Sequence, residues 1–215
     1  MIKAKRADNV INLLKQRYKN VEIALQYSNP FELLAATILS AQCTDEQVNK
    51  VTAVLFKKYR SIEAYAQADP AEMEVIVHSA GFFRNKTKNI INTAKIIVDK
   101  FGGKVPETME DLTTLPGVAR KTANIVLGHC FRKTEGIAVD THVIRISRLL
   151  ALTEEKDPVK IEKDLINLVL PQNRLEFSLL IQTLGRQVCK ATRPQCPHCP
   201  LLLLCPSAKH TSTHS

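Results

Sequence analysis

Four cysteines near the end of the chain have the spacing of metal or cluster ligands. Cys189, Cys196, Cys199 and Cys205 follow the pattern C-x6-C-x2-C-x5-C, and prolines between them prevent the segment from continuing as a helix. Thiolates are soft ligands that suit zinc or an iron–sulfur cluster. Structural zinc sites commonly use two separate C-x2-C pairs, and this segment has one. The spacing therefore favours a [4Fe–4S] cluster over zinc, with a disulfide pair or chance clustering as the plainer alternative.

A glycine turn precedes a second group of residues with reactive or DNA-binding side chains. The segment LPGVARKTANIVL places Gly117 just before an expected helix, where backbone N–H groups can bind an anion. This pattern is typical of a helix-hairpin-helix, which binds DNA phosphates without reading the bases, although an αα-hairpin with no DNA would have the same sequence signal. We expect DNA contacts from Leu115, Gly117, Val118, Ala119 and Arg120.

Lys121 lies at the start of the helix that follows this turn. The helix dipole and the adjacent Arg120 both favour a neutral amine, and burial would act in the same direction. A neutral amine is the nucleophile that Schiff-base chemistry requires. The residue type alone favours the simpler role of a phosphate contact, which is also the role expected for Lys86 and Lys88.

A carboxylate and an imidazole stand together in the segment GIAVDTHVIRISRLL. Asp140 is placed to cap the helix that follows, and a carboxylate there could instead orient the lysine, take its proton or steady a cationic sugar. The spacing between positions 121 and 140 does not fix a distance in space. For His142 we expect a contact to phosphate or water from a helix surface, with a catalytic role as the alternative.

The elements that must position these residues are helices. Helix-capping signals occur at Asn29-Pro30, Thr44, Asp69-Pro70 and Asp157-Pro158, and a helix of about 85–100 should end at Gly102-Gly103. The hairpin should consist of a short helix ending near residue 114 and a second helix over about 121–129. GIAVD is the nearest candidate for a strand and is too short to anchor a sheet. The expected fold class is all-α.

The whole chain has the charge of a protein that binds a polyanion. Its 215 residues include 30 Lys and Arg against 21 Asp and Glu, a net charge of +9, although solubility alone could explain such a charge. No stretch approaches the roughly 18 apolar residues of a membrane span, and the first residues follow a helical stripe rather than a signal peptide. We therefore expect an intracellular protein without a membrane partner, in which the six cysteines are reduced.

Five segments together resemble the endonuclease III family of helix-hairpin-helix DNA glycosylases. They are LSAQCTDEQVNK, GFFRNKTKNI, LPGVARKTANIVL, AVDTHV and the cysteine segment, in the order in which the family has them, and they cover about 29–205. The resemblance implies that Lys121 and Asp140 are catalytic and that the four cysteines bind a [4Fe–4S] cluster. It also implies that Gln42 fills the space left by a flipped nucleotide and that Phe82 is a wedge in the duplex.

The resemblance further implies the architecture. A six-helix domain would span 22–132, with the helix-hairpin-helix at about 107–131, and a cluster domain would combine 1–21 with 133–215 around the cluster loop 189–205. The active site would lie in the cleft between the two domains. In the cluster domain, the loop would present Lys190 and Arg193 to DNA phosphates.

The activity implied is that of a bifunctional DNA glycosylase and AP lyase of base excision repair. Such an enzyme would act as a monomer in the bacterial cytoplasm, associated with the nucleoid, remove damaged pyrimidines from double-stranded DNA and cut 3′ to the abasic site by β-elimination through a lysine Schiff base. One alternative is an adenine glycosylase of the MutY type, which lacks the lysine and carries a further recognition domain. The other is a non-catalytic helix-hairpin-helix protein that only binds DNA.

Three positions depart from the family pattern. Ala119 stands where the hairpin usually has a second glycine, so it must keep a negative φ or tolerate strain. Phe82 replaces a smaller aliphatic wedge, which could shift the range of lesions. Cys43 replaces a small residue beside Gln42, and no function is assigned to it.

Overall fold

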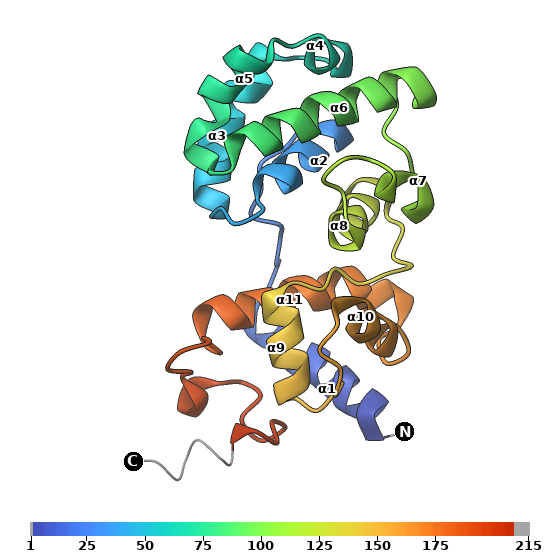
Figure 1. Cartoon of the computed structure of the whole chain (residues 1–215). Helices are drawn as coiled ribbons and strands as arrows, with labels where there is room; N and C mark the ends of the chain where they lie inside the picture. Colours follow the sequence, from blue (N-terminus) through green and yellow to red (C-terminus); the bar gives the residue numbers. More distant parts are fainter. Residues whose placement is uncertain (1, 209–215) are drawn as a thin grey trace. The chain divides into compact units, whose positions relative to one another are not determined.

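Helices form the secondary structure throughout residues 2–208, the part of the chain that this computed structural model describes, and no strand occurs within that range (Figure 1). The all-α expectation is confirmed. The candidate strand GIAVD forms no strand. The helices in chain order are α1 Ile2–Arg17, α2 Pro30–Leu39, α3 Asp45–Lys58, α4 Ile62–Ala66, α5 Pro70–Val77, η1 His78–Ala80, α6 Phe83–Phe101, α7 Met109–Thr113, α8 Arg120–Phe131, α9 Thr141–Leu149, α10 Pro158–Ile166, η2 Pro171–Asn173, α11 Arg174–Gln187 and η3 Cys196–His198.

Side-chain caps fix the starts of several helices where the sequence predicts them. Asn29 accepts a hydrogen bond from the backbone N–H of Glu32 at 3.0 Å, and Thr44 accepts one from Gln47 at 3.3 Å. Asp157 caps α10 with both Val159 and Lys160 N–H groups at 3.0 Å. These bonds satisfy N–H groups that have no partner within the helix.

The chain divides into two compact units. Unit 1 comprises Met1–Glu22 with Thr134–Ser215, and unit 2 comprises Ile23–Lys133. Unit 2 therefore holds the expected hairpin, Gln42 and Phe82, whereas unit 1 holds Asp140 and the cysteine segment.

Helix α6 is the central element of unit 2. It packs against α4, α5 and α2, and α8 packs in turn against α2 and α7. Its buried face carries Ile90, Ile91, Ala94 and Ile97 at the spacing of an amphipathic helix. Helix α6 thus forms the common packing partner of α2, α4 and α5.

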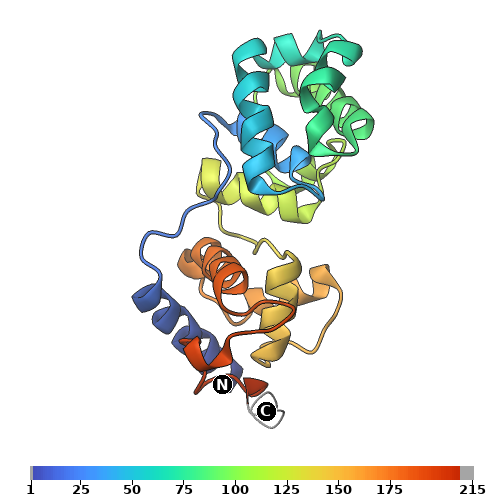
Figure 2. The ribbon, with the colours of Figure 1, turned by 90° about the vertical axis from the view of Figure 1, so that its left-hand side faces the viewer.

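Unit 1 combines the two ends of the chain (Figure 2). Helix α1 packs against α11, and α11 packs against α9. Val10, Leu14, Phe177 and Leu180 are fully buried in this core, which Leu201 of the cysteine segment also joins. Among residues 2–208, the structure contains no helix with the length and hydrophobicity of a membrane span.

Candidate active site and nucleic-acid interface

The turn of the hairpin requires a glycine. It lies between α7 and α8, and the backbone N–H of Val118 donates to the carbonyl of Leu115 at 3.1 Å. Gly117 has φ +78°, and a Cβ there would lie 2.7 Å from Nδ2 of Asn89 in α6. Backbone conformation and space therefore both exclude a larger residue at this position.

Helix α6 also supports the turn through a hydrogen bond. The hydroxyl of Thr93 donates to the carbonyl of Pro116 at 3.1 Å, and the Thr93 side chain is fully buried. Leu115 and Val118 are 2% and 6% exposed, so only their backbone groups are available to a phosphate. Gly117, Ala119 and Arg120 are exposed.

The alanine in place of the second glycine introduces no strain. Ala119 has φ −94° and ψ 171°, which is extended backbone that any residue adopts. It is the N-cap of α8 and provides no side-chain cap to it. The first N–H groups of this helix thus remain oriented for an anion.

Lys121 is exposed on the first turn of α8. Its surroundings do not bury it, so burial adds nothing to the two effects that favour a neutral amine. The position at the positive end of a helix dipole and next to Arg120 is as expected.

Gln42 and Phe82 share an unusual backbone conformation. Both are non-glycine residues with left-handed φ angles, 54° and 49°, and both are exposed. The Phe82 ring is 68% exposed, although a large aromatic side chain gains by burial. Strained backbone and exposed apolar surface are concentrated where a side chain must be presented to a partner.

The expectation that Lys86 contacts a phosphate is wrong. Lys86 is 4% exposed, and its ammonium donates a hydrogen bond to the carbonyl of Ala80 at 2.8 Å. Burial lowers the pKa of Lys86, and the neighbouring Cys43 opposes that shift. Lys88 is exposed, as a phosphate contact must be.

In unit 1, Asp140 is the N-cap of α9, as the sequence predicts. Its carboxylate accepts a hydrogen bond from the backbone N–H of Val143 at 2.8 Å. The cap fixes the direction of the carboxylate and stabilises the first turn of the helix. One oxygen of the carboxylate suffices for this bond, so the capping role leaves a second oxygen for other chemistry.

His142 packs against a glycine of the neighbouring helix. A Cβ at Gly185 of α11 would lie 2.9 Å from Cγ of His142 and closer still to Nδ1. The imidazole therefore occupies the space that any side chain at position 185 would fill. Gly185 was missed by the sequence reasoning, although a glycine inside a helical pattern is a signal of close packing.

The four cysteines line one small cavity of unit 1, about 80 Å³ in volume, together with apolar side chains such as Leu149 and Leu202. Burial raises the pKa of both Cys189 and Cys199, while Arg145 acts in the opposite direction on Cys189. The Arg145 guanidinium also donates to the backbone carbonyl of Cys189. Within residues 2–208, no three His, Cys, Asp or Glu side chains converge in a way that could hold one metal ion.

The polar side chains of the cysteine segment point to solvent. Lys190 and Arg193 are exposed, as the predicted DNA contacts must be, and Arg193 has a left-handed φ of 57°. His198 is also exposed.

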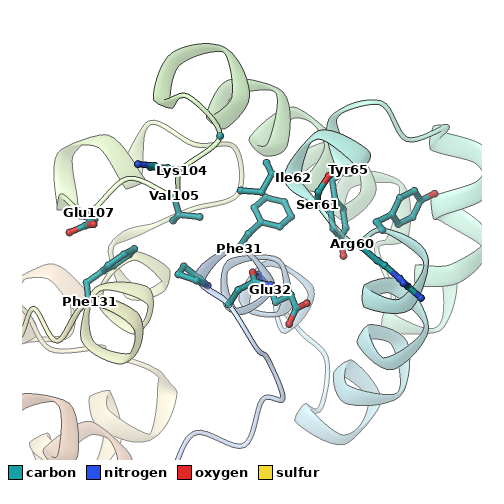
Figure 3. Close-up of a pocket in the computed structure, with 14 residues that line it drawn as sticks. Phe31, Glu32, Arg60, Ser61, Ile62, Tyr65, Lys104, Val105, Glu107 and Phe131 are labelled. Atoms are coloured by element: carbon teal, nitrogen blue, oxygen red, sulfur yellow. The ribbon is translucent and has the colours of Figure 1, made fainter.

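A second cavity, of about 400 Å³, lies in unit 2 (Figure 3). Phe31, Tyr65, Val105 and Phe131 form its apolar wall, and the Phe31 and Tyr65 ring centroids are 4.9 Å apart. Phe131 is the last residue of α8, and Lys121 is on the first turn of that helix, so the cavity lies at the opposite end. None of the predicted site residues lines it.

Comparison with known proteins identifies the class that this fold and hairpin define. Residues 35–171 match the family described as HhH-GPD superfamily base excision DNA repair protein. The chain is 51% identical over 207 residues to endonuclease III of Synechocystis sp. (strain ATCC 27184 / PCC 6803 / Kazusa), covering 96% of this chain and 94% of that protein. It is 41% identical to endonuclease III of Bacillus subtilis (strain 168), covering 95% and 94%.

Among solved structures, a trapped endonuclease III–DNA covalent intermediate superposes with a TM-score of 0.93 and 38% sequence identity. The match covers 99% of this chain and 100% of that chain. The chain therefore belongs to the endonuclease III family.

Proposed function

We propose that this protein is a bifunctional DNA glycosylase and AP lyase that removes damaged pyrimidines from duplex DNA and then cuts the strand. The observation that carries the proposal is the position of Lys121, exposed on the first turn of α8 directly after the glycine turn. Membership of the endonuclease III family supports it, as does the covalent DNA intermediate trapped for the related protein. The bacterial relatives support action in the cytoplasm on DNA of the nucleoid.

Binding begins with contacts that do not depend on sequence. The backbone N–H groups of the turn at Gly117 and the start of α8 bind a phosphate, and Arg120 adds a charge-assisted contact. Lys190 and Arg193 contact the backbone from unit 1. The net charge of +9 favours all of these contacts through release of counterions.

Base extrusion follows from the two exposed, left-handed residues. Phe82 enters the stack as an apolar wedge, and Gln42 fills the space left by the extruded nucleotide. Damaged pyrimidines that stack or pair poorly are less costly to extrude, which gives part of the selectivity.

Lys121 then acts as the nucleophile. Its neutral amine attacks C1′ of the deoxyribose, the C1′–N bond to the base breaks, and the base leaves with the bonding electron pair and is protonated. Asp140 takes the proton that the lysine nitrogen loses and assists opening of the sugar ring to a Schiff base. Loss of a C2′ proton expels the 3′ phosphate, and water then releases the enzyme. Lys121 belongs to unit 2 and Asp140 to unit 1.

We also propose that Cys189, Cys196, Cys199 and Cys205 bind a [4Fe–4S] cluster. The support is that all four line one small cavity of unit 1. Four thiolates in one segment are the ligands that a [4Fe–4S] cluster uses. The cluster, when bound, stabilises the fold of the segment that presents Lys190 and Arg193.

Borohydride reduction during reaction with a thymine-glycol duplex tests the proposal. An active enzyme forms a covalent protein–DNA adduct under reduction and a cleaved strand without it. A protein that binds the duplex but gives neither adduct nor product would be a non-catalytic DNA-binding protein, and the proposal would be wrong.

A further inference from the structure

The two residues proposed to enter the duplex lie on separate loops. Gln42 belongs to the loop between α2 and α3, and Phe82 follows η1 and Gly81. Each has a left-handed backbone that costs conformational energy, and each side chain is exposed. Something else must hold these two loops in a fixed geometry if both side chains are to enter one site.

Lys86 lies at the base of the loop that carries Phe82. Its side chain is 4% exposed, and its ammonium donates to the carbonyl of Ala80, two residues before Phe82. One side chain of α6 therefore holds η1 at the base of the Phe82 loop.

A second link joins η1 to the start of α3 at the surface. The side-chain amide of Gln47 at the start of α3 donates to the hydroxyl of Ser79 in η1 at 2.7 Å. Both residues belong to exposed segments, so this bond is screened by water and weaker than the buried one. The adjacent residues Ser79 and Ala80 thus tie η1 to α3 and to α6, respectively.

A buried lysine amine is less favourable than an apolar side chain of the same size. Burial of a charged or polar group costs free energy unless it is well hydrogen-bonded, and a methionine of similar length would fill the volume without that cost. Farther along α6, Asn89 and Thr93 contact the hairpin turn at Gly117 and Pro116. The same helix thus contacts both the base of the Phe82 loop and the phosphate-binding turn.

We propose that Lys86 is a positioning residue: it fixes η1 at the base of the Phe82 loop, and Gln47 ties η1 to the start of α3, directly after the Gln42 loop, so that both side chains are held in place to enter the duplex. This inference rests on the proposed function. It does not give Lys86 a contact with DNA or with the reacting atoms, because its ammonium is turned to the Ala80 carbonyl.

The test compares Lys86→Met with wild-type protein on two substrates. One is a thymine-glycol duplex, and the other is a single-stranded abasic oligonucleotide, which needs no wedge or filler. Lys86→Met should lower kcat/KM on the duplex about tenfold, because small misplacements of positioned groups are costly, and leave single-strand cleavage unchanged. Lys86→Arg, which keeps the charge and donors, should restore part of the loss. Lys95→Met, which removes an exposed lysine of the same helix, is the matched control and should resemble wild type.

A double-mutant cycle distinguishes coupling from general damage. If Lys86 acts through the loops, adding Lys86→Met to Gln42→Ala/Phe82→Ala should cause no further loss on the duplex. An additive loss, an equal loss on the single strand, or a Lys86→Met protein that behaves like Lys95→Met would overturn the inference.

An unfolded Lys86→Met protein and an inactive wild-type protein have different consequences for the inference. If Lys86→Met does not fold, as judged by circular dichroism, Gln47→Ala tests the same coupling from the surface and should give a smaller loss confined to the duplex. A wild-type protein that cuts neither substrate would instead contradict the proposed function.

Discussion

The imidazole of His142 lies directly against Gly185, in the space where a side chain at that position would be. His142 is two residues after Asp140, the cap of α9. The packing of α9 on α11 therefore sets the orientation of the helix whose Val143 N–H holds the Asp140 carboxylate.

Gly185→Ala should displace His142 and tilt the start of α9. Alanine favours helix over glycine by about 1 kcal/mol, but overpacking at a buried contact typically costs about 1–3 kcal/mol. We expect a net loss in the free energy of unfolding and a larger loss of turnover, measured by denaturant titration and strand cleavage. Addition of His142→Ala should remove the clash and recover stability. A stable, fully active Gly185→Ala protein would show that this contact does not position the site.

Asp140→Asn should separate the two roles of the carboxylate. Asparagine caps helices as well as aspartate, so stability should be retained. It cannot accept a proton from the lysine, and general acid–base catalysis is worth about 100-fold or more. We expect single-turnover base removal to slow by that factor, while Asp157→Asn, the same change at the cap of α10, leaves it unaltered. Equal rates for the two variants would remove Asp140 from the mechanism.

The cysteine segment should contain iron rather than zinc. Protein purified without air exposure should yield about four irons and four sulfides per chain. Cys199→Ser should lower both contents and destabilise unit 1, because the segment that carries Leu201 joins its core. Cys130→Ser is the control, because that thiol lies in α8 of unit 2, outside the cysteine segment. Stoichiometric zinc would contradict the cluster.

Tyr65→Phe should be neutral or stabilising. The hydroxyl of Tyr65 is buried without a hydrogen-bond partner among the described residues, and burial raises the pKa of this phenol, so it stays neutral. Removal of an unsatisfied buried hydroxyl should change the free energy of unfolding by about 0 to +1 kcal/mol. Tyr65→Ala should lose about 3–5 kcal/mol because the ring is deeply buried against Phe31. A clear loss in Tyr65→Phe would mean that the hydroxyl has a partner, such as water.

Local signals explain why much of the fold could be predicted from the sequence. Asn29, Thr44 and Asp140 each cap a helix through a side chain to nearby backbone, an interaction that spans only a few residues. The glycine turn of the hairpin is equally local, and Gly117 has the positive φ that such a turn needs. The condition placed on Ala119, a negative φ, is also met.

Residues that depend on distant contacts were not predictable in this way. Lys86 has the sequence context of a surface lysine, and its burial follows only from tertiary packing, in which its ammonium donates to the Ala80 carbonyl of η1. The exposure of Lys121 likewise depends on what surrounds α8. Thr93, which holds the hairpin turn, lies 23 positions before Pro116, a separation that no spacing rule connects.

The most direct test of the central claim is borohydride trapping by Lys121→Ala on abasic duplex DNA. The account predicts that this variant binds the duplex with near wild-type affinity, forms no covalent adduct and cuts no strand, whereas Lys88→Ala still traps. Peptide mapping of the wild-type adduct should place the sugar remnant on position 121. An adduct of wild-type yield with Lys121→Ala, or a remnant mapped to another lysine, would contradict the account.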